Sequence, residues 1–578
     1  MDIDPKNDPT FEGFDAFVKK VMDDWKVPGL GVAVVKGDQV LLAKGYGYRD
    51  VENKQPADAE TIFAIGSASK AFASMAVAQM VDEGKVEWDK PVRDYMPDFK
   101  LMDNFATERM SPRDLLCHRS GLPRHDVMWY NSSFSRKELY ERLRYLEPNK
   151  DFRTNFQYQN LMYLTAGYLV ERVTGKTWEE YTDEHTIKML GMARTNFSVD
   201  VSKKHANIAF PYSKEKDQVK QIPFRNIDAV GPAGSINSTP LDMARWVIAH
   251  LNEGKYGDAQ IVSKANLKQL HTPTTPIPGS FFPGIDEVKE LGDMSYGLGW
   301  FMQAYRGRRL IHHGGNIDGF SALISFMPDD GVGVVLLTNL NGTFSTFPLM
   351  LNIYDRVLGL DQLEMNNKFL EAIKKLEAGA EEAKQKSAGQ RKPNTKPSHD
   401  LSEYLGDFEH PAYGLLKITK NGDGMRMTYN NIAYKMEHFH YDVFEGTMEE
   451  GLEMTFKAAF FSDMQGNITS VAVPLEGNVK DIVFNRKAGE EMYKKEFLER
   501  FVGKYRFMET QIIEVAMKED HLIASLMDQG EFDLEPYMGT QFKLKGSPAG
   551  IEFKVEDGKV PGADLLQGGA VFYAEKIE

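Results

Sequence analysis

The sequence has few of the residues that hold metals or disulfides. Its 578 residues include one cysteine, Cys117, so neither an intramolecular disulfide nor a cysteine metal cluster can form. There is no His-Glu-x-x-His or paired-histidine spacing, and His438 and His440 alternate as strand residues do. We therefore expect no cofactor and no dependence on metal.

Long apolar runs and basic patches are also lacking. No stretch approaches the roughly 20 apolar residues that span a bilayer. The first residues, Met-Asp-Ile-Asp-Pro-Lys-Asn-Asp, lack the basic and apolar regions of a signal peptide. We expect a cytoplasmic protein without a membrane span, with export after removal of a signal peptide as the alternative. The formal net charge of −15 argues against a nucleic-acid partner, which would need a basic face.

What remains is the composition of a large globular protein, with 42% hydrophobic and 26% charged residues. The first 370 or so residues mix short β runs with amphipathic helices. Residues 30–36 and 40–46 flank a Gly-Asp turn, residues 322–327 and 332–338 flank Pro-Asp-Asp-Gly, and these four runs can form one antiparallel sheet. Helical segments lie between them, at residues 71–83, 158–174 and 240–251. The fold class is α+β with a helical insertion.

The chain changes character near residue 376. Residues 376–399 read as the tail of a helix that runs into a charged linker containing proline, and short alternating strands follow. We place a first domain at 1–375, a linker at 376–400, and all-β modules at 401–490 and 491–578.

The all-β half is repetitive. Tyr404-Leu-Gly-Asp-Phe408 opens one unit and Phe501-Val-Gly-Lys-Tyr505 opens another, and each closes on an aromatic strand. Two tandem β modules are therefore predicted. The alternative is one larger sandwich made from the same strands.

Ser67-Ala-Ser-Lys70 is the first candidate for chemistry, because it puts a hydroxyl and an amine one helical turn apart. A serine needs a neighbouring base to become a nucleophile, and Lys70 is within reach of Ser67. A second tetrad, Ser213-Lys-Glu-Lys216, lies in a charged segment without apolar periodicity and indicates a solvated loop. Other residues must decide between the two.

Tyr158-Gln-Asn160 is the second candidate, at the start of an apolar helix. A tyrosine whose pKa is lowered by an adjacent ammonium can accept the serine proton and later return it to a leaving group. The amide of Asn160 can hold Lys70 or the substrate. In a purely structural interpretation, the tyrosine is a packed ring and the asparagine is a helix cap.

His312-His-Gly-Gly-Asn316 is the third candidate, and it precedes the run at 322–327. Glycines 314 and 315 leave no Cβ in the way of a ligand that adds to an exposed strand edge. Because strand side chains alternate, one histidine would point at the site and the other away. The alternative is an ordinary Gly-rich turn.

Together, Ser67-x-x-Lys70, Tyr158-x-Asn160 and His313-x-Gly315 resemble, in that order, the three signatures of the penicillin-recognising serine hydrolases. This family includes class C β-lactamases, D-alanyl-D-alanine carboxypeptidases, D-aminopeptidases and esterases. The resemblance implies a β-lactamase-like antiparallel sheet with a helical subdomain over residues 14–358. The all-β half resembles the lipocalin-like or small barrel modules of D-aminopeptidases.

The resemblance also implies a mechanism. Ser67 attacks an acyl carbonyl, Lys70 and Tyr158 share the proton, and water releases the acyl group. The backbone N–H groups of Ser67 and Asn316 form the oxyanion hole. The implied substrate-binding residues are Asn160, His313, Gly315 and Asn316.

The histidine at position 313 narrows the range of substrates that we expect. β-Lactamases of this branch usually carry a lysine there, whereas a histidine with a pKa near 6.5 is mostly neutral at pH 7. We therefore expect hydrolysis of a small peptide, amide or ester rather than strong hydrolysis of β-lactams. Our first hypothesis is a D-aminopeptidase-like or carboxypeptidase-like serine hydrolase. The alternatives are a carboxylesterase, a weak β-lactamase, and a non-catalytic binding protein, which the complete motifs count against. The oligomeric state stays open.

Overall fold

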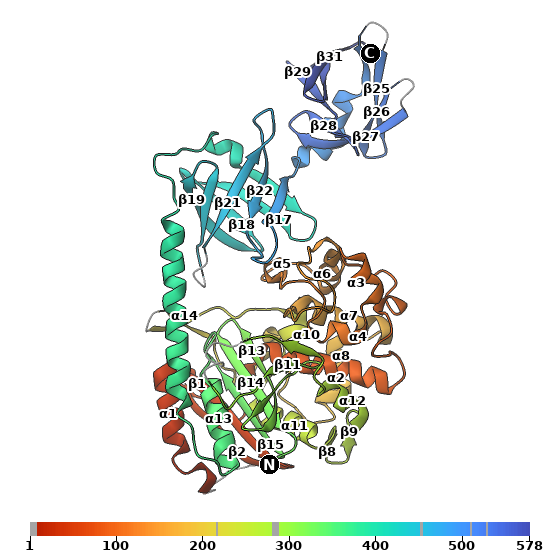
Figure 1. The fold of residues 1–578 in the computed structure, drawn as a ribbon. Helices are drawn as coiled ribbons and strands as arrows, with labels where there is room; N and C mark the ends of the chain where they lie inside the picture. The colour runs from red at the N-terminus through yellow and green to blue at the C-terminus, as the bar shows by residue number, and fades with distance from the viewer. Residues whose placement is uncertain (1–8, 216–217, 280–287, 451–454, 509–510, 527–529) are drawn as a thin grey trace. The chain divides into compact units, whose positions relative to one another are not determined.

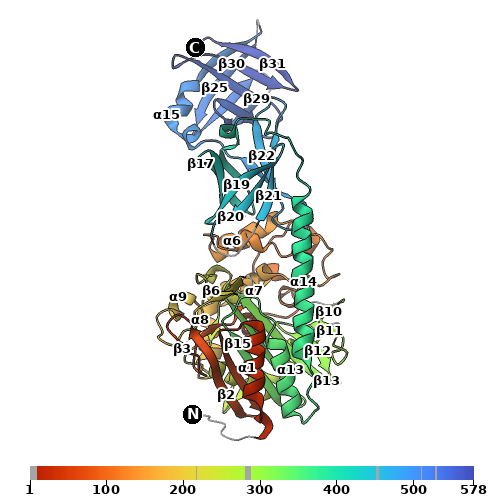
Figure 2. The ribbon, with the colours of Figure 1, turned by 90° about the vertical axis from the view of Figure 1, so that its left-hand side faces the viewer.

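The computed structural model describes residues 9–215, 218–279, 288–450, 455–508, 511–526 and 530–578. They form two compact units. One contains Met1–Arg391 with Glu476–Lys480, and the other contains Lys392–Leu475 with Asp481–Glu578. Figures 1 and 2 show the elements of each unit.

The N-terminal unit is built on one nine-stranded sheet whose neighbouring strands are all antiparallel. The four strands expected from the sequence lie side by side in it, so that prediction is confirmed. The sheet order is β10 (Thr275–Ile277), β11 (Met294–Tyr296), β12 (Phe301–Tyr305), β13 (Arg308–Ile317), β14 (Phe320–Met327), β15 (Val332–Thr338), β1 (Gly29–Lys36), β2 (Gln39–Asp50) and β3 (Gln55–Pro56). Strands β14 and β15 are buried throughout, because helices cover both faces of the sheet.

One face of the sheet packs on α1 (Phe14–Trp25), α13 (Thr346–Val357) and α14 (Met365–Ala388), as Figure 2 shows. Their apolar stripes form one core with the sheet, to which α1 contributes Phe14 and Val18 and α14 contributes Phe369. Helix α14 extends into the predicted linker, so the segment from 376 to 388 is helical.

The other face carries α2 (Ser69–Asp82), α7 (Asn160–Thr174) and α11 (Pro240–Leu251). Rings of α2 and α11 stack, with the centroids of Phe72 and Trp246 4.0 Å apart. The three predicted helices are present, but α7 begins two residues later than expected. Gln159 caps it by accepting from the N–H groups of Leu161 and Met162, so Tyr158 precedes the helix.

Short elements complete this unit. They are the helices α3 (Asn104–Arg109), α4 (Pro112–Leu115), α5 (Asp126–Trp129), α6 (Arg136–Arg142), α8 (Trp178–Thr182), α9 (Val199–Ser202), α10 (Gly231–Gly234) and α12 (Lys264–Leu270), and the strand pairs β4 (Phe63–Ala64) with β7 (Asn237–Ser238), β5 (Tyr212–Glu215) with β6 (Gln218–Gln221), and β8 (Lys255–Tyr256) with β9 (Ala259–Gln260).

The competing tetrad begins at Ser213, in strand β5. The prediction of a solvated loop is wrong for Ser213, which is buried in strand β5. Its potential partner Lys216 lies outside the described residues.

The C-terminal unit consists of two closed eight-stranded barrels, so the alternative of a single sandwich is wrong. The first barrel closes through Phe408 opposite Arg486, and the second through Tyr505 opposite Lys576. The strands of the first barrel are β16 (Gly406–His410), β17 (Gly414–Asn421), β18 (Gly424–Tyr429), β19 (Ile432–His440), β20 (Val443–Met448), β21 (Thr455–Ser462), β22 (Ile468–Val473) and β23 (Ile482–Arg486). The strands of the second barrel are β24 (Gly503–Phe507), β25 (Gln511–Lys518), β26 (His521–Leu526), β27 (Gly530–Met538), β28 (Gln541–Leu544), β29 (Gly550–Glu556), β30 (Lys559–Gln567) and β31 (Ala570–Lys576). The short helix α15 (Lys495–Leu498) precedes β24.

The predicted fold class, a β-lactamase-like α+β domain followed by all-β modules, is confirmed. Within the described ranges, no helix is both long and apolar enough to cross a membrane.

Candidate active site

Ser67 lies in a single 3-10 turn, η2 (Gly66–Ala68), between strand β4 and helix α2. The next serine holds this turn in place. The Ser69 hydroxyl donates to the Gly66 carbonyl at 2.8 Å and accepts from the Ile236 N–H at 3.1 Å. Ser67 is thus presented at the N-terminal end of a buried helix by backbone that is tied to a second segment.

Strand β13 approaches this turn closely at Gly315. A Cβ added there would lie 1.8 Å from the Ile65 carbonyl oxygen and 2.8 Å from the Ser67 nitrogen. A Cβ on Gly66 would lie 2.7 Å from the Asn316 nitrogen. The sequence argument expected the glycine to make room for a ligand, but the space at Gly315 is taken by the turn that carries Ser67.

Lys70 lies directly below Ser67 and is fully buried. Its Nζ has three neighbours at hydrogen-bonding distance. The Ser67 Oγ is at 3.1 Å, the Asn160 Oδ1 at 2.7 Å and the Ala233 carbonyl oxygen at 2.8 Å. The one-turn spacing therefore does bring the amine to the hydroxyl.

The charge of Lys70 follows from its surroundings. Burial lowers the pKa of Lys70 well below 10.5, and the positive charge of Arg124 lowers it further. The Asp126 carboxylate opposes this shift but does not cancel it. The lowered pKa favours the neutral amine at Lys70.

Asn160 holds Lys70. Its Oδ1 accepts from Lys70, and its Nδ2 donates to the Asp126 Oδ1 at 2.8 Å. Both ends of the amide are used within the protein, as expected if it positions the lysine. Asn160 does not line the cavity above Ser67, and its predicted contact with substrate stays a prediction.

Tyr158 lies in an extended segment that is clamped by His118. The His118 carbonyl accepts from the Gln157 N–H at 2.7 Å, and its Nδ1 accepts from the Gln159 N–H at 3.1 Å. The imidazole of His118 lies 4.3 Å from the Tyr158 ring, between centroids. Through this clamp the Tyr158 hydroxyl reaches Ser67, to which it is hydrogen bonded.

The expectation of a lowered pKa for Tyr158 is wrong. Burial raises the pKa of Tyr158 above 10, and its hydrogen bond to Ser67 and the charge of Arg124 only partly oppose this. The expectation assumed an ammonium at Lys70. A buried phenol beside a neutral amine keeps its proton, so Tyr158 is a hydrogen-bond donor in this site.

The two histidines of β13 point in different directions. His313 lines the cavity with Ser67, whereas the imidazole of His312 stacks on the Phe301 ring, 5.7 Å between centroids. His313 Nδ1 lies 2.6 Å from the Gly314 carbonyl, which can only accept, so Nδ1 carries the proton. Nε2 then accepts from the Tyr296 hydroxyl at 2.9 Å. Burial is the main cause that lowers the pKa of His313 well below 6.5, so His313 is neutral.

A cavity of about 680 Å³, open solvent included, lies above Ser67. Of the predicted site residues, Ser67, Tyr158, His313 and Asn316 line it, while Lys70, Asn160 and Gly315 lie behind the lining. Along one wall, β13 pairs with β12 only as far as His312, although it pairs with β14 as far as Ile317. Within the described residues, the stretch 313–317 therefore offers an open strand edge to the cavity.

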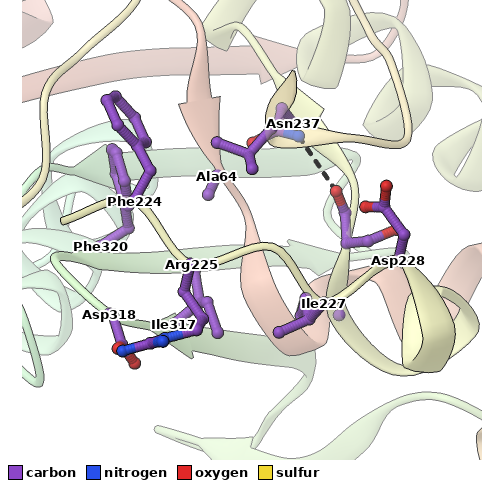
Figure 3. Close-up of a pocket in the computed structure, with 12 residues that line it drawn as sticks. Ala64, Phe224, Arg225, Ile227, Asp228, Asn237, Ile317, Asp318 and Phe320 are labelled. Atoms are coloured by element: carbon purple, nitrogen blue, oxygen red, sulfur yellow. Dashed lines mark hydrogen bonds and ion pairs between the residues drawn. The ribbon is translucent and has the colours of Figure 1, made fainter. Parts of the chain in front are cut away.

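A second, smaller pocket adjoins the site (Figure 3). Its lining includes Phe224, Arg225, Ile227, Asp228, Ile317, Asp318 and Phe320. Asn237, labelled in Figure 3, donates from its Nδ2 to the Ser235 carbonyl at 3.0 Å. Arg225 donates there to the Asp318 Oδ2 at 3.0 Å and to Asn131. The cation of this pocket is therefore paired.

Sequence reasoning missed three contributors to the site besides the His118 clamp. They are the Ala233 carbonyl, the Tyr296 hydroxyl, and the pair of Arg124 with Asp126, whose Nε–Oδ2 distance is 2.6 Å. A backbone carbonyl leaves no signal in a sequence. The run Pro123-Arg-His-Asp126 did carry one, since two opposite charges follow a Gly-Leu-Pro turn.

Known families match both halves of the chain. The model described as Beta-lactamase matches residues 14–352. A model described as a domain of unknown function, DUF3471, matches twice, over residues 390–486 and 489–572. The two matches follow the two barrels.

Individual proteins are also similar to the chain. Unguisins hydrolase ungD' of Aspergillus campestris is 29% identical over 431 residues, which cover 71% of this chain and 78% of the relative. The solved structure of the octameric penicillin-binding protein homologue from Pyrococcus abyssi has a TM-score of 0.53 at 22% identity, covering 82% of this chain and 99% of that one. The solved structure of D-amino acid amidase from Ochrobactrum anthropi SV3 has a TM-score of 0.48 at 23% identity, and the match covers 60% of this chain and 98% of that one. The likeness to the first of these structures is one of fold.

Proposed function

The chain belongs to the β-lactamase family, and we propose that it is a serine hydrolase that forms an acyl-enzyme at Ser67 and cleaves a peptide or amide bond. The observation that carries this proposal is the arrangement around the Lys70 amine. A neutral amine has two N–H bonds and one lone pair. The Asn160 and Ala233 oxygens can only accept, so they take the two N–H bonds. The lone pair is left for the Ser67 hydroxyl at 3.1 Å.

The proton transfers that acylation needs can then all take place among these residues. The Ser67 oxygen forms a bond with the substrate carbonyl carbon while its proton moves to Lys70. The Tyr158 hydroxyl gives its proton to the leaving nitrogen as the amide bond breaks, and it regains a proton from the Lys70 ammonium. The free enzyme's protonation states are restored, and a water molecule later releases the acyl group by the reverse sequence.

Charge on the carbonyl oxygen is stabilised in this proposal by the backbone N–H groups of Ser67 and Asn316. Support comes from the close approach of η2 and strand β13, which brings these two nitrogens to one end of the cavity. Donors already aimed at the developing oxyanion need no reorganisation, and loss of one typically costs about a hundredfold or more in rate.

An amide is favoured over an ester because of Tyr158. An amine leaves only when it is protonated, whereas an activated alcohol or phenol leaves without protonation. The neutral Tyr158 hydroxyl beside Ser67 can supply the proton that the leaving amine requires. The neutral His313 supports a peptide or amide substrate over a β-lactam antibiotic, since it supplies no positive charge. A carboxylesterase that uses the same residues is the second candidate.

The proposal is tested with a panel of chromogenic substrates and with Ser67→Ala as the control for contaminating hydrolases. We expect turnover of D-Ala-p-nitroanilide or its L form above that of nitrocefin, and no turnover by the variant. Hydrolysis of p-nitrophenyl acetate alone would favour the esterase. Turnover of nitrocefin above all other substrates would overturn the argument from His313.

A further inference from the structure

The cavity above Ser67 is lined by uncharged side chains with one exception, Arg124. Its lining consists of Ser67, Arg124, Tyr158, Phe301, His313, Gly314, Asn316, Ser321, Ala322, Thr343, Phe344, Thr346 and Phe347. Arg124 alone among these residues carries a full charge at neutral pH, because His313 is neutral and no lining residue is acidic. The lowered pKa of Lys70, beneath Ser67, favours a neutral amine there as well. Recognition of a charged substrate in this cavity therefore depends on Arg124.

Arg124 is held in one place. Its Nε donates to the Asp126 Oδ2, and the other Asp126 oxygen accepts from the Asn160 amide. The guanidinium carbon lies 4.9 Å from the centroid of the Tyr158 ring. A carboxylate at one edge and an aromatic face together fix the plane of the guanidinium, so little further ordering is needed when it binds a ligand.

The two terminal nitrogens of this guanidinium are not engaged in hydrogen bonds within the part of the chain that the structure describes, although the negative charge of Glu476, which accepts from the His125 N–H, helps to raise the pKa of Arg124. The Arg124 side chain is 50% exposed. Arg225 of the neighbouring pocket differs, because it is paired with Asp318 and its side chain is only 17% exposed. Terminal guanidinium nitrogens form a planar fork that matches the two oxygens of a carboxylate.

The position of Arg124 indicates which part of the substrate it meets. It covers the ring of Tyr158, and in the proposed mechanism the Tyr158 hydroxyl donates to the leaving group. The rings of Phe301, Phe344 and Phe347 supply apolar lining in the same cavity. The fork therefore lies on the side from which the leaving group departs.

We infer that Arg124 binds a free carboxylate on the leaving group, so that the enzyme prefers substrates whose leaving amino acid ends the peptide chain. This inference rests on the proposed acyl-enzyme function of Ser67. It identifies Arg124 as a specificity-determining residue and separates cleavage at a carboxyl terminus from cleavage at an amino terminus.

The test compares two achiral esters that differ in one group of the leaving phenol, 3-carboxyphenyl phenylacetate and 3-carbamoylphenyl phenylacetate. We expect the full-length wild type to hydrolyse the anionic ester with a kcat/KM about tenfold or more above that of the neutral one, the gain typical of a charge-assisted pair. Arg124→Gln should reduce this ratio to near one. Arg124→Lys, which keeps the charge and loses the fork, should give an intermediate ratio.

Arg109→Gln is the matched control, because the Arg109 guanidinium also covers a ring, that of Phe105 at 5.9 Å, but does not line the cavity. Its ratio should equal that of the wild type. The ratio cancels a general loss of activity, so partial misfolding of Arg124→Gln would not imitate the expected result. An unchanged ratio in Arg124→Gln would overturn the inference while the proposed function stood. If neither ester were hydrolysed in a Ser67-dependent reaction, both would fall.

Discussion

At the scale of single residues, the account depends on the charge of Lys70. The i to i+3 spacing was enough to predict that the amine meets the Ser67 hydroxyl, because it needs only local helical geometry. The charge of that amine depends instead on burial and on the charges of Arg124 and Asp126, which come from a distant segment. The wrong expectation for Tyr158 has the same origin.

The first prediction concerns pH. The pKa of Lys70 is lowered, so the neutral amine predominates above it and the ammonium, which has no lone pair to offer, below it. The kcat/KM for an amide should therefore rise with pH through an ionisation well below 10.5 and stay high beyond it. A profile measured under non-denaturing conditions checks this. A rise only near 10.5 would contradict a buried neutral lysine.

The second prediction concerns Asn160. Replacing its amide by a carboxyl group in Asn160→Asp puts that group against both Lys70 and the Asp126 carboxylate. The added negative charge is compensated best by the ammonium, which raises the pKa of Lys70. The acid limb of the pH profile should move to higher pH by about one unit or more. Asn160→Ala is the control, since it should slow turnover without this upward shift. Equal profiles for both variants would show that Asn160 does not act through Lys70.

At the scale of elements, the sequence was sufficient to predict the strands and hairpins that depend on local residue patterns. The two hairpins at 30–46 and 322–338 were predicted from turn residues between β runs, and they lie side by side in the sheet. The contact of β13 with η2 was not predicted as such, because it joins segments about 250 residues apart in sequence, as for Ile65 and Gly315. The sequence pattern indicated that a glycine was needed there but not what approaches it.

The third prediction tests this contact. In Gly315→Ala the new Cβ would lie 1.8 Å from the Ile65 carbonyl, so β13 and η2 must separate. We expect a loss of about 1–3 kcal/mol in the free energy of unfolding, together with a large fall in kcat. Gly314→Ala is the control for stability, since the atom nearest to its new Cβ would be the Ala322 oxygen, at an ordinary contact distance of 3.5 Å. Equal melting temperatures for the two variants would mean that the close approach is not required.

At the scale of the whole molecule, each unit has its own core. The change of character near residue 376 and the repeat of about a hundred residues were visible in the sequence, whereas the compact units divide after Arg391. Closure of each module into a barrel depends on pairing of its first and last strands. In the second barrel the core runs from Ala488 to Ala574 and includes Phe501, Phe542 and Phe553. All the described residues of this core belong to the C-terminal unit.

The fourth prediction follows from that separation. Phe553 is 1% exposed and stacks on Phe501 at 4.5 Å between centroids. Phe553→Ala should destabilise the second barrel by about 3–5 kcal/mol and leave the temperature at which hydrolysis is lost unchanged. Phe572→Ala, on the same barrel but 39% exposed, should have little effect on either. Calorimetry with parallel activity measurements checks this, and a joint fall of both temperatures in Phe553→Ala would refute independent units.

The central claim is that Ser67 forms a covalent acyl-enzyme, and direct trapping tests it. The full-length protein is incubated with a fluorophosphonate or a fluorescent penicillin, digested, and mapped by mass spectrometry. The account predicts one adduct on the peptide that contains Ser67, slower labelling of Lys70→Ala, and no labelling of Ser67→Ala. An adduct on another serine such as Ser213, or equal labelling of Ser67→Ala, would contradict it.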